Sequence, residues 1–253
     1  MKIVSLNLWN GGRLFDAAMS FLKGQNADIY LLQECYDGHN PDLAARFRTV
    51  ELLKANFPDY EVRFAGFYLD CRSVEGEIED GQVIMSRWPL SYAQMIWFDV
   101  PYGRYDNDAM TDFSELSAGM LKAEFAYGDK QITLLNVHGP WHLAGDDDTP
   151  RRQVMVRSIL DNLGEHTVLA GDFNAQPSVA SMKKLALRLI NLFDGDLTTS
   201  FNVKRKDLAK FPGYATAVVD MAFTTPNWRL LAKQVPQVDV SDHLPLVFEI
   251  EPI

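Results

Sequence analysis

The chain has 253 residues, 47% of them hydrophobic, which is enough for one substantial domain with a buried core. Its formal net charge of −10 argues against general attraction to nucleic acid or an anionic membrane, although a bound cation could still hold an anionic substrate. The sequence has no signal-peptide pattern, no apolar run of about 18 residues, and too few cysteines for a disulfide framework. We therefore expect a soluble, cytoplasmic, monomeric protein with a single domain over residues 1–253 and no membrane span.

Apolar runs that alternate or are continuous predict about ten β-strands. In chain order they are residues 2–9, 28–34, 60–69, 81–87, 92–100, 118–127, 130–138, 167–173, 218–224 and 244–250. Helical periodicity occurs at residues 14–23, 42–56, 150–163 and 179–193, with Thr149 and Ser178 as the expected N-caps of the last two. Paired strands separated by two sets of helices predict two mixed β-sheets packed face to face, with helices outside.

Polar side chains recur at the ends of these strands, where placement beside a core is costly unless the group is paired or binds a metal. In chain order they are Asn7, Glu34, His138, Asp172, Asn174, Asp220, Asp242 and His243. Several have ordinary explanations when taken singly, since GDFN often marks a strand-to-turn junction and SDH often marks a cap or a turn. Asp220 is harder to explain, because an unpaired carboxylate inside an apolar strand costs several kcal/mol.

The residue types in this set suit phosphodiester hydrolysis. That reaction needs a hard divalent cation to neutralise charge on the phosphoryl oxygens, and oxygen ligands such as Glu34 suit Mg²⁺ or Mn²⁺. It also needs a water activated by a carboxylate or an imidazole, and donors directed at the oxygens on which charge develops. Asn174, His138 and His243 could supply those donors.

Five stretches, LNLWN, LLQE, GDFN, VVDMAF and SDHLPL, resemble the endonuclease/exonuclease/phosphatase superfamily in sequence and order. The resemblance covers essentially the whole chain and implies a four-layer α/β/β/α sandwich with metal-dependent phosphoester hydrolysis. It makes Glu34 the principal ligand of Mg²⁺ or Mn²⁺, with Asn7, Asp172 and Asp242 completing the shell directly or through water. Asp172 and Asn174 would lie beside the scissile phosphate, as a water-activating or leaving-group-side carboxylate and a phosphate-oxygen donor.

The same resemblance gives roles to the histidines. Asp220 would accept a hydrogen bond from His243 and raise its basicity, so that His243 acts on the attacking water or a phosphoryl oxygen. His138 would be the second histidine, with Asp80 at the position where the family often has an acidic partner for it. The HGPWH stretch, which contains Trp141, departs from the apurinic-site endonucleases and favours the deoxyribonuclease, tyrosyl-DNA phosphodiesterase and sphingomyelinase side.

Two loops offer substrate contacts. In the first, Arg104 lies between two tyrosines that could stack a base. In the second, residues 203–210, four basic side chains could contact a polyanionic backbone, namely Lys204, Arg205, Lys206 and Lys210. A solvated loop is the more frequent explanation of such a charge run.

The leading hypothesis is a metal-dependent phosphodiesterase or nuclease that cleaves nucleic acid or its end adducts. The alternative is a phosphatase or phosphodiesterase acting on a small or lipid-linked phosphoester, which the acidic net charge favours. A binding module with a decayed site is disfavoured, since no expected catalytic residue is missing.

Overall fold

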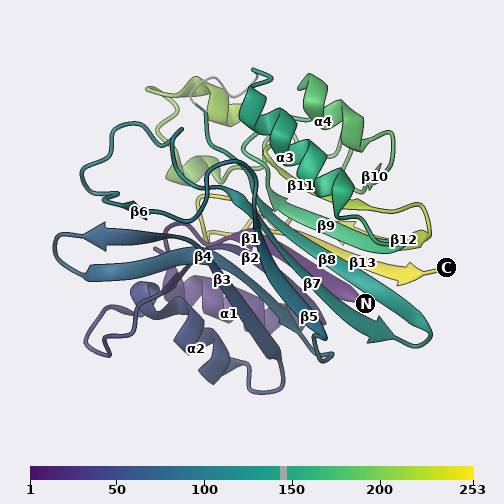
Figure 1. Cartoon of the computed structure of the whole chain (residues 1–253), viewed down its shortest axis with the longest axis horizontal. Helices are drawn as coiled ribbons and strands as arrows, with labels where there is room; N and C mark the ends of the chain where they lie inside the picture. Colours follow the sequence, from purple (N-terminus) through teal and green to yellow (C-terminus); the bar gives the residue numbers. More distant parts are fainter. Residues whose placement is uncertain (143–146) are drawn as a thin grey trace.

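The structure, a computed structural model, describes residues 1–142 and 147–253. Two β-sheets lie face to face, and helices cover the outer face of each (Figure 1). Helices α1 (Phe15–Gln25) and α2 (Thr49–Asn56) lie on one side, and α3 (Pro150–Asp161) and α4 (Ala180–Leu185) lie on the other. The predicted four-layer sandwich of two mixed sheets is confirmed.

The first sheet has seven strands in the order β12-β13-β1-β2-β4-β3-β6. β1 is parallel to β2 and antiparallel to β13. The first and last strands in chain order are therefore neighbours in this sheet. The strands are β1 (Lys2–Asn7), β2 (Ile29–Asp37), β3 (Glu61–Arg72), β4 (Gly76–Ser86), β6 (Arg104–Tyr105), β12 (Trp228–Gln234) and β13 (Leu246–Pro252).

The second sheet has six strands in the order β10-β11-β9-β8-β7-β5. β8 and β9 run in parallel, and β11 is antiparallel to β9. The strands are β5 (Tyr92–Trp97), β7 (Gly119–Tyr127), β8 (Lys130–His138), β9 (His166–Asp172), β10 (Ile190–Asn191) and β11 (Asp220–Thr224). Short 3₁₀ helices occur at η1 (Ala45–Arg48), η2 (Val203–Arg205) and η3 (Pro212–Ala215).

Each predicted strand is present, and three strands were not predicted. β6 and β10 have only two residues each, and β12 is an edge strand whose residues after Trp228 are exposed, so it carries no alternating pattern. The predicted helix at 42–56 divides into η1 and α2. Within residues 1–142 and 147–253, no helix combines the length and the apolar character that a membrane crossing requires.

The helix predicted at residues 179–193 is wrong beyond Leu185, where α4 ends. Leu185 and Leu189 pack outside the second sheet, whereas Leu192 and Phe193 pack between the two sheets. One straight helix cannot place residues in both of these layers, so the chain turns after α4 and forms β10. The predicted cap at Ser178 is also wrong, because Val179 is the N-cap residue and makes no side-chain cap bond.

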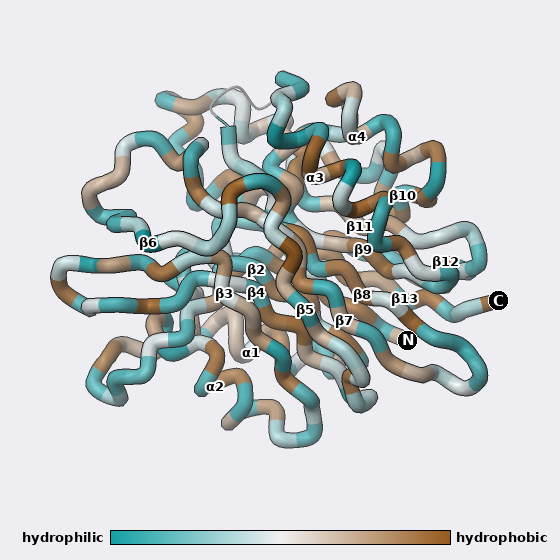
Figure 2. Tube along the Cα trace, in the orientation of Figure 1, coloured by the Kyte–Doolittle hydropathy of each residue, from teal (hydrophilic) through white to brown (hydrophobic). Residues whose placement is uncertain are grey.

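The core has three layers of buried apolar residues, one between the sheets and one beneath each helical layer. Central strands are therefore buried on both faces, which explains their continuous apolar sequences. Figure 2 shows hydrophobic residues concentrated along these central strands and hydrophilic residues in the outer loops.

This arrangement brings several strand ends to one edge of the sandwich. His138 at the end of β8 lies opposite Asp172 at the end of β9, and Asp172 in turn lies opposite Asp220 at the start of β11. In the first sheet, Asn7 at the end of β1 pairs with Gln33 of β2. The polar residues that terminate the apolar runs therefore share one end of the molecule.

Gly171 precedes Asp172 and has a φ of +145°, and a Cβ there would lie 2.1 Å from the carbonyl oxygen of Val137. We expect Gly171→Ala to lower the free energy of unfolding by about 2 kcal/mol or more, because both the backbone and the neighbouring strand resist the methyl group. Gly24→Ala is the matched control, since nothing lies within 4 Å of its Cβ. The control should raise stability by up to about 1 kcal/mol. Equal unfolding midpoints in urea for both variants would contradict this expectation.

Candidate functional site

A cavity of about 260 Å³ lies at the edge where the strand ends meet. Nine of the residues predicted from the sequence line it, namely Glu34, Asp80, His138, Trp141, Asp172, Asn174, Lys206, Asp242 and His243. Asn7 and Asp220 lie behind these residues, each bonded to at least one of them. Segments that are far apart along the chain therefore meet at one concave surface that is strongly acidic.

Glu34 enters the cavity from a β-bulge in β2. The register between β2 and β4 shifts between Leu32 and Cys35, and Glu34 adopts a φ of +53°. A bulge adds one residue to a strand and redirects a side chain. Here the extra residue carries the carboxylate.

Asn7 positions two carboxylates. Its side-chain oxygen accepts a hydrogen bond of 2.9 Å from the Trp9 N–H, so its amide nitrogen must face the other way. That nitrogen donates to Glu34 Oε1 at 2.8 Å and to Asp172 Oδ2 at 3.2 Å. The second Glu34 oxygen accepts the Asn10 N–H at 2.5 Å. Asn7 therefore holds the two carboxylates through its amide nitrogen, while its side-chain oxygen accepts from the Trp9 N–H.

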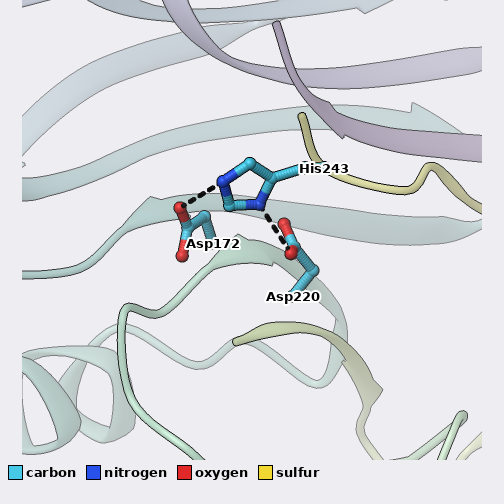
Figure 3. Close-up of side chains that lie close together, drawn as sticks. All are labelled: Asp172, Asp220 and His243. Carbon is cyan, nitrogen blue, oxygen red and sulfur yellow. Dashed lines mark hydrogen bonds and ion pairs between the residues drawn. The ribbon is translucent and has the colours of Figure 1, made fainter. Parts of the chain in front are cut away.

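His243 lies between two aspartates (Figure 3). Its Nδ1 is 2.8 Å from Asp220 Oδ2, and its Nε2 is 3.9 Å from Asp172 Oδ2. Burial by itself lowers the pKa of His243, but the charges of Asp220, Asp242 and Asp172 outweigh burial and raise this pKa to about 10. The imidazole is thus cationic at neutral pH, with an N–H directed to each side.

Asp172, Asp220 and His243 each offer a ligand atom, and these atoms lie within 4.8 Å of one another. The group could therefore hold a metal ion. Without one, the imidazolium supplies the positive charge between the two carboxylates.

His138 approaches the same carboxylates from β8. Its Nε2 lies 3.8 Å from Asp172 Oδ2 and 3.9 Å from Glu34 Oε1. Burial raises the pKa of Asp172, and the positive charge of His243 opposes that rise. Asp172 is therefore a carboxylate of increased basicity between two imidazoles.

Asn174 follows Asp172 in a tight turn, with a φ of +49°. Its N–H donates to Asp172 Oδ1 at 2.8 Å, and its amide nitrogen donates to the Gly139 carbonyl at 3.0 Å. The buried guanidinium of Arg152 in α3 donates to the Asn174 carbonyl. The turn is thus held from three directions, and one amide hydrogen of Asn174 stays available to a ligand.

Asp80 has a different partner from the expected one. The expected neighbour was His138, but Asp80 Oδ2 accepts a hydrogen bond of 2.7 Å from the Tyr68 hydroxyl. Asn107 donates in turn to the Tyr68 oxygen at 3.0 Å. Burial raises the pKa of Asp80 well above its usual range, and the charge of Glu34 adds to the effect.

Lys206 is paired with Asp242 inside the cavity, with Nζ and Oδ2 2.6 Å apart. The same ammonium lies 4.5 Å from the ring centroid of Phe201 and 4.6 Å from that of Tyr214. Among the described residues that line the cavity, Lys206 is the one lysine or arginine. Asp242, an expected metal ligand, thus already faces a cation of the protein.

The four other basic residues expected to contact substrate lie outside the cavity. Arg104 pairs with Glu77 at the surface and Arg205 pairs with Asp239, while Lys204 in η2 and Lys210 are exposed. The basic run at residues 203–210 correctly indicated a segment that reaches the cavity, but it did not indicate that Lys206 is the side chain that points inward. Tyr68 and Asn107 were also missed, because neither ends an apolar run.

Backbone strain concentrates around the cavity. The non-glycine residues with positive φ in the described part of the chain are Trp9, Asn10, Asn26, Glu34 and Asn174. Each of them except Asn26 lines the cavity. Strained backbone of this kind clusters at functional sites, where the surrounding structure must hold it.

A model of the endonuclease/exonuclease/phosphatase family matches residues 4–243 of the chain. An endonuclease/exonuclease/phosphatase from Beutenbergia cavernae is similar in structure, with a TM-score of 0.75 at 17% identity over 100% of this chain and 71% of that one. The mannosyl-6-phosphatase Bt3783 of Bacteroides thetaiotaomicron gives 0.72 at 15% identity, over 99% of each chain. TDP2 of D. rerio, complexed with a single-strand DNA product, gives 0.69 at 17% identity, over 99% and 98%. No curated protein matches at the level of sequence.

The raised pKa of His243 makes stability depend on pH. Because the pKa rises from 6.5 to about 10 on folding, the stabilisation is fully present below pH 6.5 and is lost as pH increases toward 10. In EDTA, urea unfolding of the wild type should show this decline, and Asp220→Asn should show a shallower one because a main source of the shift is gone. His39→Asn, at an exposed loop position, should keep the wild-type profile. Parallel pH profiles for wild type and Asp220→Asn would disprove the coupling.

Proposed function

The chain belongs to the endonuclease/exonuclease/phosphatase family, and on this basis we propose that it is a divalent-metal-dependent hydrolase of small phosphoesters. The observation that carries the proposal is the pair of carboxylates, Glu34 and Asp172, that Asn7 holds together at the cavity, opposite the cationic His243. Acidic groups and a charged donor gathered at strand ends suit an anionic ester that arrives with a metal ion.

The donor set fits Mg²⁺ or Mn²⁺. The cavity offers carboxylate and amide oxygens, and no cysteine is among the described residues that line it, so hard cations are favoured over soft ones. Glu34 would be the principal ligand, since its carboxylate is fixed by two hydrogen bonds and its side chain is still 20% exposed. Asp242 would join it if Lys206 moved aside. The bound metal would neutralise charge on the phosphoryl oxygens.

The protein's own groups account for the remaining steps. Asp172 accepts the proton of the attacking water, a role that its raised pKa favours. The charged His243, together with His138 and Asn174, donates hydrogen bonds to the phosphoryl oxygens as charge develops on them. The new P–O bond forms to the water oxygen, the P–O bond to the alcohol breaks, and the departing oxygen takes up a proton from the charged His243.

The cavity favours a small ester as the substrate. The sequence alone had favoured a nucleic acid. Arg104, Lys204, Arg205 and Lys210 do not line the cavity, and Lys206 is the one lysine or arginine among the described residues that do. The net charge of −10 also opposes binding to a polyanionic backbone. The likeness to a mannosyl-6-phosphatase and to TDP2 does not choose between substrates, because at 15–17% identity it extends to the fold alone.

An activity panel tests the proposal. The purified protein would be assayed with Mg²⁺, Mn²⁺, Ca²⁺ or EDTA against sugar phosphates, bis-p-nitrophenyl phosphate, a phosphocholine lipid, a 5′-tyrosyl oligonucleotide and plasmid DNA. We expect the small esters to turn over with Mg²⁺ or Mn²⁺ and to be inert in EDTA. Preferred cleavage of the oligonucleotide or plasmid would instead support the nuclease hypothesis. Full activity in EDTA would refute metal dependence.

Glu34→Gln should weaken Mg²⁺ or Mn²⁺ binding at least 10-fold in calorimetry, because it removes the charge of the principal ligand while keeping its shape. The melting temperature in EDTA should change little, since the glutamine oxygen can still accept from Asn10. Glu77→Gln, at an exposed position away from the cavity, is the control. An unchanged metal affinity in Glu34→Gln would remove Glu34 from the site.

Once a metal takes Asp242, the Lys206 ammonium in the cavity would be free to bind the phosphoryl group. Lys206→Met should therefore raise the KM for a phosphate monoester about 10- to 100-fold, with a smaller effect on kcat, since it deletes that charged donor. Inorganic phosphate should lose affinity as an inhibitor by a similar factor. Lys204→Met changes the same segment outside the cavity and should leave both constants near wild type. Equal constants for Lys206→Met and Lys204→Met would show that Lys206 serves only Asp242.

A further inference from the structure

A smaller cavity of about 60 Å³ adjoins the first and shares Tyr68, Asp80, His138 and Trp141 with it. Phe113 and Trp141 line both spaces, and their rings pack edge to face with centroids 6.2 Å apart. Aromatic rings therefore line part of this region, and the hydrogen-bonded group of Asp80, Tyr68 and Asn107 makes up its polar side.

Two buried oxygens on that polar side have no partner. Asp80 is 5% exposed, and its Oδ1 accepts no hydrogen bond, although its Oδ2 accepts one from Tyr68. The side-chain oxygen of Asn107 is also without a partner. A buried acceptor that is left unpaired costs about 1–3 kcal/mol, so a ligand that donates hydrogen bonds to these two oxygens would be stabilised by the cost that it removes.

The orientation of Asn107 is fixed by its neighbours. Its backbone N–H and its amide nitrogen donate to the two oxygens of Asp70, at 3.1 and 3.3 Å. Asp70 is itself paired with Arg72, which keeps the carboxylate an acceptor. The amide nitrogen also donates to Tyr68. The oxygen of Asn107 is therefore the atom left free to receive a donor.

Aliphatic hydroxyl groups match this pair of acceptors. A hydroxyl can donate to the Asn107 oxygen and to an ionised Asp80, and it can accept from Asp80 if that carboxyl is protonated. The C–H face of a saturated ring would pack against Trp141 and Phe113. Ligand-binding sites commonly combine apolar walls of this kind with a few polar groups that orient the ligand. An unsubstituted hydrocarbon ring would leave both oxygens unpaired.

We propose that Asp80 and Asn107 form a subsite for the hydroxyl groups of the leaving alcohol, so that the substrate is a phosphate ester of a polyhydroxylated ring. The inference rests on the proposed function and gives it a substrate class, either a sugar phosphate or a cyclitol phosphate. The ring lies beside Asp80 and Asn107, while its phosphate lies toward Asp172 and His243.

The test compares hydroxylated ring esters with bare-ring esters of the same ring size. Wild-type kcat/KM would be measured with Mg²⁺ or Mn²⁺ for glucose 6-phosphate, for myo-inositol 1-phosphate, and for cyclohexylmethyl phosphate and cyclohexyl phosphate. We expect a preference of about 10²-fold or more for one hydroxylated ester over its bare-ring counterpart, since a site built for hydroxyl groups rejects analogues without them. Which hydroxylated ester is preferred distinguishes sugar from cyclitol.

Asn107→Leu should then reduce that preference ratio about 10-fold, because it deletes one acceptor at nearly constant volume. Asn56→Leu, on α2 and away from both cavities, should keep the wild-type ratio. A wild-type ratio near one, with both esters hydrolysed, would overturn the subsite while the proposed function stands. Hydrolysis of neither these esters nor bis-p-nitrophenyl phosphate would overturn the function itself, and preference for the tyrosyl oligonucleotide would assign the subsite to a nucleic-acid end.

Discussion

The bulge in β2 is the constraint on which the site depends. Leu32 pairs with Val83 and Cys35 pairs with Gly81, so two residues of β2 lie opposite a single residue of β4. Leu32 and Cys35 both pack beneath the outer helices, and this is possible only because the bulge interrupts the alternation between them. Glu34 is the residue gained. In a regular strand it would alternate with Leu31 and Gln33 and would point under the helices, where a carboxylate has no partner.

Gln33, the other residue of the bulge, connects the two sheets by hydrogen bonds. Gln33 keeps its direction toward the second sheet, where its amide nitrogen donates to Asn136 Oδ1 at 2.6 Å. Asn136 returns hydrogen bonds to the carbonyls of Leu32 and Val83, at 2.9 and 3.0 Å. Such a buried polar bridge tolerates little sliding of one sheet over the other. Because His138 lies two residues beyond Asn136 on β8, the bridge also sets how closely the carboxylates of the two sheets approach.

The sequence predicted the parts of the molecule that local pattern encodes. Strands that are buried on both faces give long apolar runs, and polar residues that end them, such as His138 and Asp172, converge because the strand ends do. Glu34 ends its apolar run but lies inside β2, so its direction depends on the bulge, which the pattern does not indicate. The inward turn of Lys206 could not be predicted in the same way, since Arg205 and Lys204 beside it have the same charge and only the pairing with Asp242 separates them. The partner of Asp80 depends on the register of β3 against β4, which places Tyr68 opposite it. The turn after Leu185 reflects a change of layer, which apolar spacing alone does not indicate.

The position of β13 has a consequence for how the protein is made. β1 lies in the interior of its sheet only after β13 pairs with it, as Lys2 does with Glu249, and Asp242 and His243 arrive on the segment that precedes this strand. A nascent chain on the ribosome therefore carries Glu34 and Asp172 long before it can complete the cavity, and β1 keeps an open edge until β13 has been made. Pairing across so many residues is intrinsically slow. Chaperones that shield unpaired strand edges would therefore matter most until β13 has been made, because the strand and the segment before it complete the sheet and the cavity together.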